Sequence, residues 1–172
     1  MNHKRSNGFT LIEILVVLAL VGVLVSVAML AIRGRDTQSV VDESVQQLAF
    51  SLRVAGEETL FRRRALGLYL YKSGYLFLAS DKEGWYPVNE NFFKPREFPE
   101  ELRLTLYVDA APQVLDEEPP TGDDAEIKPQ IQLIPDAEAI PFEMLFDLEG
   151  LQQRKIEMTP TGRILTHLEA EK

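Results

Sequence analysis

The residue with the clearest chemical potential in this 172-residue chain is Glu13, a carboxylate inside an apolar segment. Over the 24 residues from Phe9 to Ile32, the apolar run is interrupted only by Thr10, Glu13, Gly22 and Ser26. A carboxylate costs about 2.5–3.5 kcal/mol at the centre of a membrane helix and less near its end. This cost is offset when the group is neutralised, hydrated or paired with a cation. Glu13 is therefore a candidate pairing residue.

Residues that commonly carry catalysis are otherwise scarce. The chain has no cysteine, which excludes disulfides, thiolate metal sites, iron–sulfur clusters and cysteine nucleophiles. It has two histidines, His3 and His167, which is too few for a histidine metal site or a catalytic triad. It has no Gly-x-Ser-x-Gly, phosphate-loop or Gly-x-Gly-x-x-Gly motif. We therefore predict a protein that is not an enzyme and that uses no cofactor.

The most acidic segment, Asp116–Glu126, contains six carboxylates and no basic residue. We interpret it as a solvated loop, because like charges without apolar neighbours have no reason to pack. The oxygen ligands of Asp123, Asp124 and Glu126 suit calcium, but their spacing lacks the EF-hand pattern. The sequence therefore predicts no metal site, with this loop as the weak alternative.

The apolar run that contains Glu13 is long enough to cross a bilayer. Its 24 residues make about 36 Å of helix, and the hydrocarbon core is about 30 Å thick. It is open to three interpretations: a plain anchor, a secretory signal peptide, or a leader of another kind defined by the residues around Gly8. The signal peptide would have its apolar core at Ile14–Val25 and its cleavage site at Ser26-Val27-Ala28.

The third interpretation depends on the run Gly8-Phe9-Thr10-Leu11-Ile12-Glu13, which follows a basic stretch with Lys4 and Arg5. This arrangement resembles the prepilin leader of the type IV pilin and pseudopilin superfamily. There, a prepilin peptidase cuts after the glycine and methylates the new amino terminus. The resemblance implies cleavage between Gly8 and Phe9 and N-methylation of Phe9. It also implies an assembly role for Glu13.

Beyond the membrane run, the pattern predicts first a helix and then strands. Apolar residues spaced three and four apart form an amphipathic stripe: Val41, Val45, Leu48, Leu52 and Ala55. We expect one helix from Phe9 to Leu66, ended by Gly67. Alternating segments then predict strands at 67–72, 75–80, 101–108, 130–134, 142–148, 155–158 and 163–167. The predicted fold class is α+β, a long N-terminal α-helix packed on an antiparallel β-sandwich.

These patterns divide the chain into four predicted segments. They are a leader (1–8), the transmembrane part of the helix (9–32), its amphipathic part (33–66) and a β-sandwich domain (67–172). The resemblance implies a single-pass protein of the inner membrane whose leader is cytoplasmic. The amphipathic part of the helix and the C-terminal domain would then lie in the periplasm.

The second half of the chain narrows the resemblance. The stretch Leu133–Phe142, Phe146 and the later Thr161-Gly162-Arg163 are similar to the minor pseudopilin H group of type II secretion systems (the GspH/FimT group). That group commonly has Pro-Asp-Gly-Glu in a turn where this chain has Ala137 in place of the glycine. Alanine tolerates positive φ poorly, which leaves the geometry of this turn open.

What the resemblance implies is a structural role. The chain would be a minor pseudopilin near the tip of a pseudopilus that helps export folded proteins across the outer membrane. Its implied partners are the prepilin peptidase, the minor pseudopilins I, J and K, the major pseudopilin G and the inner-membrane assembly platform.

The alternative is a minor type IV pilin of the FimT kind, which binds DNA or supports pilus assembly. Residues 36–172 contain 14 basic and 26 acidic residues, a formal net charge of −12. A field of this sign repels the phosphate backbone, so we expect no nucleic-acid partner. The sequence does not distinguish a type II secretion system from a type IV pilus system.

Overall fold

The computed structural model describes residues 11–120, 127–148 and 153–168, with the side chains of 27–37 and 168 outside that description. The chain divides into two compact units, 1–39 and 40–172. The predicted cleavage junction at Gly8 and Phe9 lies outside the described residues. The calcium candidates Asp123, Asp124 and Glu126 also lie outside them.

In the first unit, the described residues form the beginning of helix α1 (Leu11–Arg62). The side chains of 11–26 are exposed, including that of Leu11. Residues 9, 10 and 27–32 of the predicted membrane segment are outside the described side chains.

Within the part of the chain that the structure describes, no helical stretch meets the length and hydropathy required of a membrane span.

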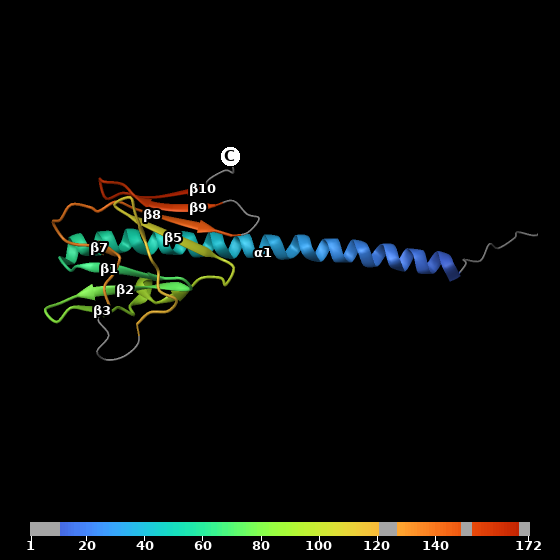
Figure 1. Cartoon of the computed structure of the whole chain (residues 1–172), viewed down its shortest axis with the longest axis horizontal. Helices are drawn as coiled ribbons and strands as arrows, with labels where there is room; N and C mark the ends of the chain where they lie inside the picture. Colours follow the sequence, from blue (N-terminus) through green and yellow to red (C-terminus); the bar gives the residue numbers. More distant parts are fainter. Residues whose placement is uncertain (1–10, 121–126, 149–152, 169–172) are drawn as a thin grey trace, which may run out of the picture. The chain divides into compact units, whose positions relative to one another are not determined.

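In the second unit, α1 continues to Arg62 and is followed by strands (Figure 1). They are β1 (Leu66–Tyr71), β2 (Gly74–Ser80), β3 (Trp85–Pro87), β4 (Arg96–Glu97), β5 (Arg103–Val108), β6 (Ala111–Gln113), β7 (Ile131–Leu133), β8 (Phe142–Asp147), β9 (Arg154–Met158) and β10 (Ile164–Leu168), with a 3-10 helix η1 at Asn91–Phe93. One antiparallel sheet, sheet A, has the order β3-β2-β1-β7, and β4 also pairs with β2. The second, sheet B, has the order β10-β9-β8-β5-β6.

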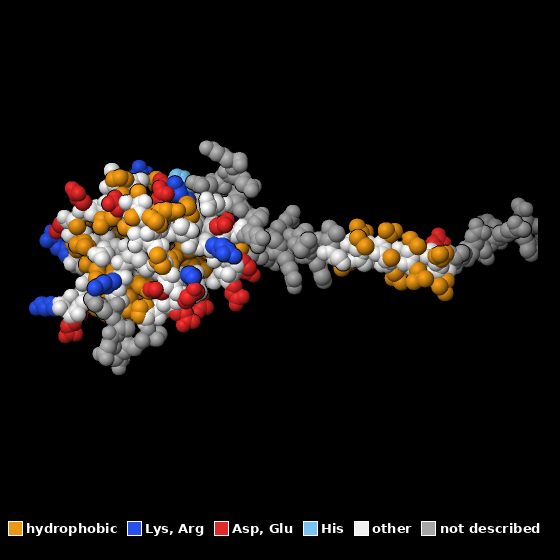
Figure 2. Space-filling view, in the orientation of Figure 1, with side chains coloured by type: hydrophobic (Ala, Val, Ile, Leu, Met, Phe, Trp, Pro, Cys, Tyr) orange, Lys and Arg blue, Asp and Glu red, His pale blue; other side chains and the backbone are white. Residues whose placement is uncertain are grey.

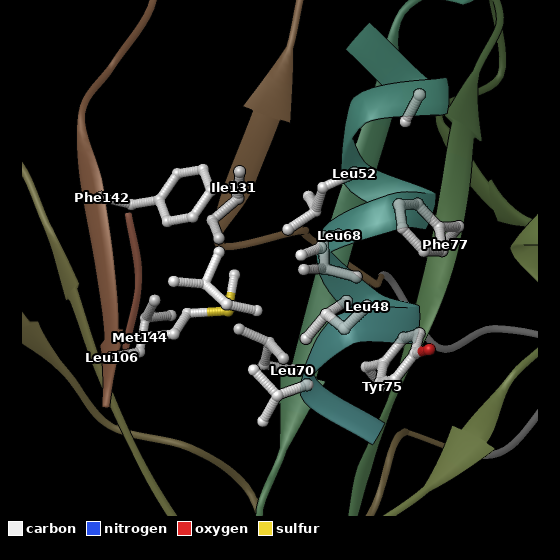
Figure 3. Packing of buried hydrophobic residues seen from close by; sticks show 14 of the residues in the cluster. Leu48, Leu52, Leu68, Leu70, Tyr75, Phe77, Leu106, Ile131, Phe142 and Met144 are labelled. Carbon is white, nitrogen blue, oxygen red and sulfur yellow. The ribbon is translucent and has the colours of Figure 1, made fainter. Parts of the chain in front are cut away.

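The hydrophobic core draws on α1 and on both sheets. Figure 3 shows Leu48 and Leu52 of α1 beside Leu68 of β1, with Met144 of β8 across from them. The whole predicted stripe of α1 is buried, from Val41 through Ala55. A stripe with this spacing lies on one side of a helix, so both sheets can cover it. The predicted α+β class, with the helix packed on antiparallel sheets, is confirmed.

The two sheets differ on their outer faces. Strands β8 and β9 alternate between buried and more exposed positions, as expected for a sheet with one covered face. Strand β1 is buried at all six positions. A second cluster explains this, because Tyr69, Tyr71, Leu76 and Leu78 pack with the partly buried Trp85 and Ile127 on the other face of sheet A.

The predicted end of the helix is wrong. The helix ends at Arg62, the next residue Arg63 has a φ of 50°, and Gly67 lies inside β1. A left-handed residue directly after a helix closes it, and here an arginine rather than a glycine takes that conformation. All seven predicted strands are present within two residues of their predicted bounds. The strands β3, β4 and β6, which have two or three residues each, were not predicted from the sequence.

The turn at Ala137 does not need a glycine. Asp136 carries the positive φ, 60°, and the Ala137 N–H donates to the carbonyl of Ile134 at 3.3 Å. Pro135 and Asp136 are therefore the central residues of a turn that places the left-handed residue at its third position, where aspartate is tolerated. Ala137 is not among the residues with positive φ, so the substitution seen in this chain is compatible with the turn.

Gly67 provides the first prediction. A Cβ at this position would lie 2.5 Å from Cγ of Pro129 and 3.0 Å from Trp85. We expect Gly67→Ala to destabilise the domain by about 1–3 kcal/mol, the usual cost of overpacking. Gly56→Ala is the matched control, because a Cβ there meets nothing within 4 Å and alanine favours helix by about 0.5–1 kcal/mol. Chemical denaturation of the full chain in detergent, followed by circular dichroism, measures the free energy of unfolding of both variants. Equal changes in the two variants would show that Gly67 is not required by its close contacts with Pro129 and Trp85.

The β5–β6 turn provides the second prediction. Asp109 and Ala110 have φ values of 49° and 59° between the paired residues Val108 and Ala111. Left-handed backbone costs a non-glycine residue roughly 1–2 kcal/mol, and glycine loses about 0.5–1 kcal/mol of entropy. We expect Ala110→Gly to stabilise the domain by about 0.5–1 kcal/mol in the same measurement. The control Ala137→Gly, where φ is not positive, should not stabilise it. A stabilising Ala137→Gly would instead place the strain at that turn.

Candidate assembly site

Of the three residues predicted to act in processing and assembly, the structure describes only Glu13. It lies in the first turn of α1 and its side chain is exposed. The first turn of a helix favours a carboxylate, because unpaired backbone N–H groups give this end a partial positive charge. Gly8 and Phe9 precede the described residues, so their position relative to Glu13 is not part of this description.

In the second unit, an ion pair attaches α1 to sheet B. The Arg154 Nε donates to Asp42 Oδ1 at 2.6 Å, and Arg154 is only 4% exposed. A buried guanidinium must be paired, and removal of its partner generally costs about 3–5 kcal/mol. The pair therefore favours one position of the helix along strand β9.

The Asp42–Arg154 pair was not predicted from the sequence, although the sequence contains a signal for it. Arg154 is in phase with the buried Ile156 and Met158 along β9. An arginine at a core-facing position needs a carboxylate, and Asp42, beside the apolar stripe of α1, supplies it.

A second attachment joins α1 to the segment around η1. Ser51 is fully buried and its hydroxyl donates to the carbonyl of Phe92 at 2.8 Å. The rings of Phe50 and Phe92 meet edge to face, with centroids 5.5 Å apart. These contacts hold the β3–β4 connection against the helix.

The three arginines at the end of the helix have separate partners. Arg62 pairs with Glu58 at 3.4 Å within the helix, and Arg63 pairs with Asp136 at 3.7 Å. Arg64 lies over the ring of Tyr86 and donates to its hydroxyl at 3.2 Å. This cluster therefore joins the helix end to neighbouring loops, and its positive charge also complements the partial negative charge at the C-terminal end of the helix.

Large apolar side chains remain exposed on α1 of the second unit. Phe61 is 87% exposed and Leu60 is 69% exposed, and Phe50 beside Phe92 is half-exposed. Phe50 and Phe61 are eleven residues apart, about three helical turns, so they lie on one side of the helix. We call Phe50, Leu60, Phe61 and Phe92 the apolar helix surface. Exposed apolar groups of this size commonly mark an interface.

The beginning of the acidic segment is held in place. The Tyr69 hydroxyl donates to Asp116, and Lys72 pairs with Glu117. Burial, together with the hydrogen bond to Asp116, raises the pKa of Tyr69 to about 12, so it remains a donor at neutral pH. Asp116 and Glu117 nevertheless remain exposed, as expected for a solvated loop. Among the described residues, no group of three or more acidic or histidine side chains is placed to hold a metal ion.

Charge on the second unit is mixed rather than basic. Figure 2 shows acidic and basic side chains interspersed over the visible face, without a continuous basic surface there. His167, the histidine outside the predicted leader, is a half-exposed strand residue whose Nε2 lies 3.3 Å from Glu157.

Comparisons with known proteins match these features. The prokaryotic N-terminal methylation motif matches residues 3–29. The chain is 30% identical to the type II secretion system protein H of Pseudomonas aeruginosa, over 96% of this chain and 97% of that protein. It is 25% identical to the protein of the same name from Aeromonas hydrophila, over 83% and 81% of the two chains.

Solved structures agree on the fold. The crystal structure of the minor pseudopilin EpsH of the type II secretion system of Vibrio cholerae superposes with a TM-score of 0.60 at 22% identity, over 77% of this chain and 99% of that one. The solution structure of Escherichia coli GspH gives 0.53 at 17% identity, over 76% and 89%. The resemblance drawn from Gly8–Glu13 and from the second half is confirmed. Because the match to the Pseudomonas protein runs over nearly the whole of both chains, this chain belongs to the type II secretion system protein H family.

Proposed function

We propose that the chain is a structural subunit of the pseudopilus of a type II secretion system, located near its tip, and that it catalyses no reaction. The observation that carries this proposal is the match to protein H along 96% of the chain, with the N-terminal methylation motif in place. In this role the chain helps to export folded proteins across the outer membrane by taking part in an assembly.

We propose that residues 9–32 cross the inner membrane and that the body of the chain lies in the periplasm. The 24-residue apolar run and the methylation motif support this topology. The division of the chain after Ser39 supports a separate globular part. The helix end at Arg62 shortens the amphipathic part of the helix proposed from the sequence, and the sandwich begins at Leu66.

We propose that Glu13 acts as a register residue between neighbouring helices. Cleavage after Gly8 would create a cationic amine on Phe9, one helical turn before Glu13. In a low-dielectric environment, an amine of one subunit and a carboxylate of the next attract strongly at one axial position and leave unpaired charges at others. N-methylation leaves the amine charged, so it does not weaken this pairing.

The proposed partners follow from the same assignment. They are the prepilin peptidase, the minor pseudopilins I, J and K, the major pseudopilin G and the inner-membrane assembly platform. The apolar helix surface (Phe50, Leu60, Phe61 and Phe92) supports contacts with neighbouring subunits, because packing would remove these side chains from water. The net charge of −12 for residues 36–172 argues against a DNA-binding minor pilin.

Processing gives the third prediction. We expect the mature chain, extracted from membranes, to start at Phe9 with a methylated amine, and we expect Gly8→Val to retain residues 1–8. Intact-mass measurement of both forms checks this. A mature chain that starts at Met29 would instead indicate a secretory signal peptide cut after Ala28.

Glu13 gives the fourth prediction. Glu13→Gln keeps the size and the helix propensity of the residue but removes its charge. We expect normal cleavage and membrane insertion with incorporation into the pseudopilus reduced by about tenfold or more, since a desolvated charge pair is worth several kcal/mol. Crosslinking to the other pseudopilins measures incorporation. The control is Glu57→Gln, which changes an exposed carboxylate of the same helix. Incorporation of Glu13→Gln at the wild-type level would show that Glu13 does not pair in this subunit.

A further inference from the structure

A cavity of about 240 Å³ lies between α1 and strand β4 in the second unit. It is lined by Val40, Glu43, Ser44, Gln47, Tyr75, Arg96, Glu97 and Phe98. One water occupies about 30 Å³ in the liquid, so this space is larger than a single hydration site. Neither Glu13 nor the apolar helix surface contributes a residue to this cavity.

One of the residues that line this cavity, Tyr75, carries a buried hydroxyl. Tyr75 is 2% exposed, and its hydroxyl oxygen is buried with no hydrogen-bond partner among the described residues. Figure 3 shows this oxygen at the end of the ring that points away from Leu48 and Leu70. A buried hydroxyl without a partner is costly, and natural structures seldom keep one without a reason. An unpaired donor on a residue that lines a cavity points to an acceptor that enters it.

Arg96 supplies charge beside this hydroxyl. Arg96 pairs with Tyr75 in the β2–β4 register, so both side chains leave the sheet on the same face. Burial raises the pKa of Tyr75 to about 12, and the charge of Arg96 acts in the opposite direction. The phenol therefore remains protonated at neutral pH. Arg96 makes no ion pair within the described part of the chain.

The two acidic residues of the lining have different positions. Glu97 pairs with Gly74 and raises the pKa of Tyr71, which belongs to the cluster on the other face of sheet A. Its carboxylate is therefore directed away from Tyr75. Glu43 is an exposed residue of α1. The donors among the lining residues are the guanidinium of Arg96, the hydroxyl of Tyr75 and the amide of Gln47.

We propose that this cavity is a binding site for a carboxylate group. The group would accept hydrogen bonds from the Arg96 guanidinium, which suits the two oxygens of a carboxylate, and from the Tyr75 hydroxyl. Glu43 at the rim opposes the negative charge and keeps the affinity low. A free small carboxylate and an acidic side chain of a neighbouring subunit share this chemistry, and only the second source rests on the proposed function.

The test uses sodium acetate as the probe and the full chain in detergent micelles. Backbone amide resonances of Ser44, Gln47, Tyr75 and Arg96 are followed by nuclear magnetic resonance during titration, with sodium chloride at matched ionic strength as the reference. We expect a saturable shift. Arg96→Gln should weaken binding about tenfold or more, because it removes the charged donor. The matched control Arg103→Gln, an exposed arginine of sheet B, should leave binding unchanged.

Two further variants separate a binding role from a structural one. Tyr75→Phe should weaken acetate binding by about two- to tenfold, the worth of one hydrogen bond, and should not lower stability, because the hydroxyl it removes is unpaired. Glu43→Gln should tighten binding, because it removes the opposing charge at the rim. Loss of stability in Tyr75→Phe would show that the hydroxyl is satisfied within the fold and would overturn the proposal. Weaker acetate binding by Glu43→Gln would also overturn it.

The remaining outcomes distinguish the sources. A photoreactive residue at position 47 that crosslinks to another pseudopilus subunit in cells, with loss of the crosslink in Arg96→Gln, identifies an acidic side chain as the ligand. Saturable acetate binding without any crosslink identifies a free carboxylate. Absence of a saturable acetate shift, or an equal shift in Arg96→Gln, would overturn the site and leave the assignment as a pseudopilin unaffected.

Discussion

Burial of one apolar stripe on helix α1 is the constraint on which the rest of the second unit depends. Val41, Val45, Leu48, Leu52 and Ala55 are all nearly inaccessible to water, and their cluster includes residues from both sheets. The two sheets do not form the core by themselves, because helix α1 contributes buried side chains to the same cluster. Fully burying a side chain of leucine size is worth about 1.5–3 kcal/mol. The position of the helix therefore determines where each strand can pack.

Polar contacts then select one arrangement among those that the apolar stripe permits. The Asp42–Arg154 pair lies beside the stripe and is sensitive to axial displacement, because a buried guanidinium that loses its carboxylate is costly. Apolar contacts alone lack this sensitivity, since one leucine can replace another at little cost. The proposed role of Glu13 depends on the same effect between subunits, since an unpaired charge in a low-dielectric environment is costly. One helix would thus carry two carboxylates that set register, Asp42 within the chain and Glu13 between chains.

Some apolar side chains of the second unit stabilise the fold by burial, whereas others are exposed and available for contacts with other chains. Sheet A is covered on both faces, and its second cluster includes Tyr69, which anchors the beginning of the acidic segment through Asp116. The helix keeps Phe61 and Leu60 in solvent although the domain has ample core elsewhere. These side chains contribute little to the isolated chain, so their apolar character is better explained by assembly. The cavity at Tyr75 and Arg96 lies between α1 and β4, where the helix and a two-residue strand meet.

The sequence by itself determined the features that depend on local periodicity or on a short contiguous motif. The Gly8–Glu13 run, the helix stripe and the seven predicted strands are of this kind, because each is encoded by neighbouring residues. Strands β3, β4 and β6 were not predicted, since two or three residues are too few to show alternation, whereas β7 lies within the longer predicted segment 130–134. The sequence also did not predict the helix end at Arg62, because Gly67 is required by the ring of Pro129 rather than by the helix. Only the tertiary structure decided the Asp42–Arg154 pair and the Tyr75–Arg96 cavity, whose residues become neighbours through packing and not through spacing along the chain.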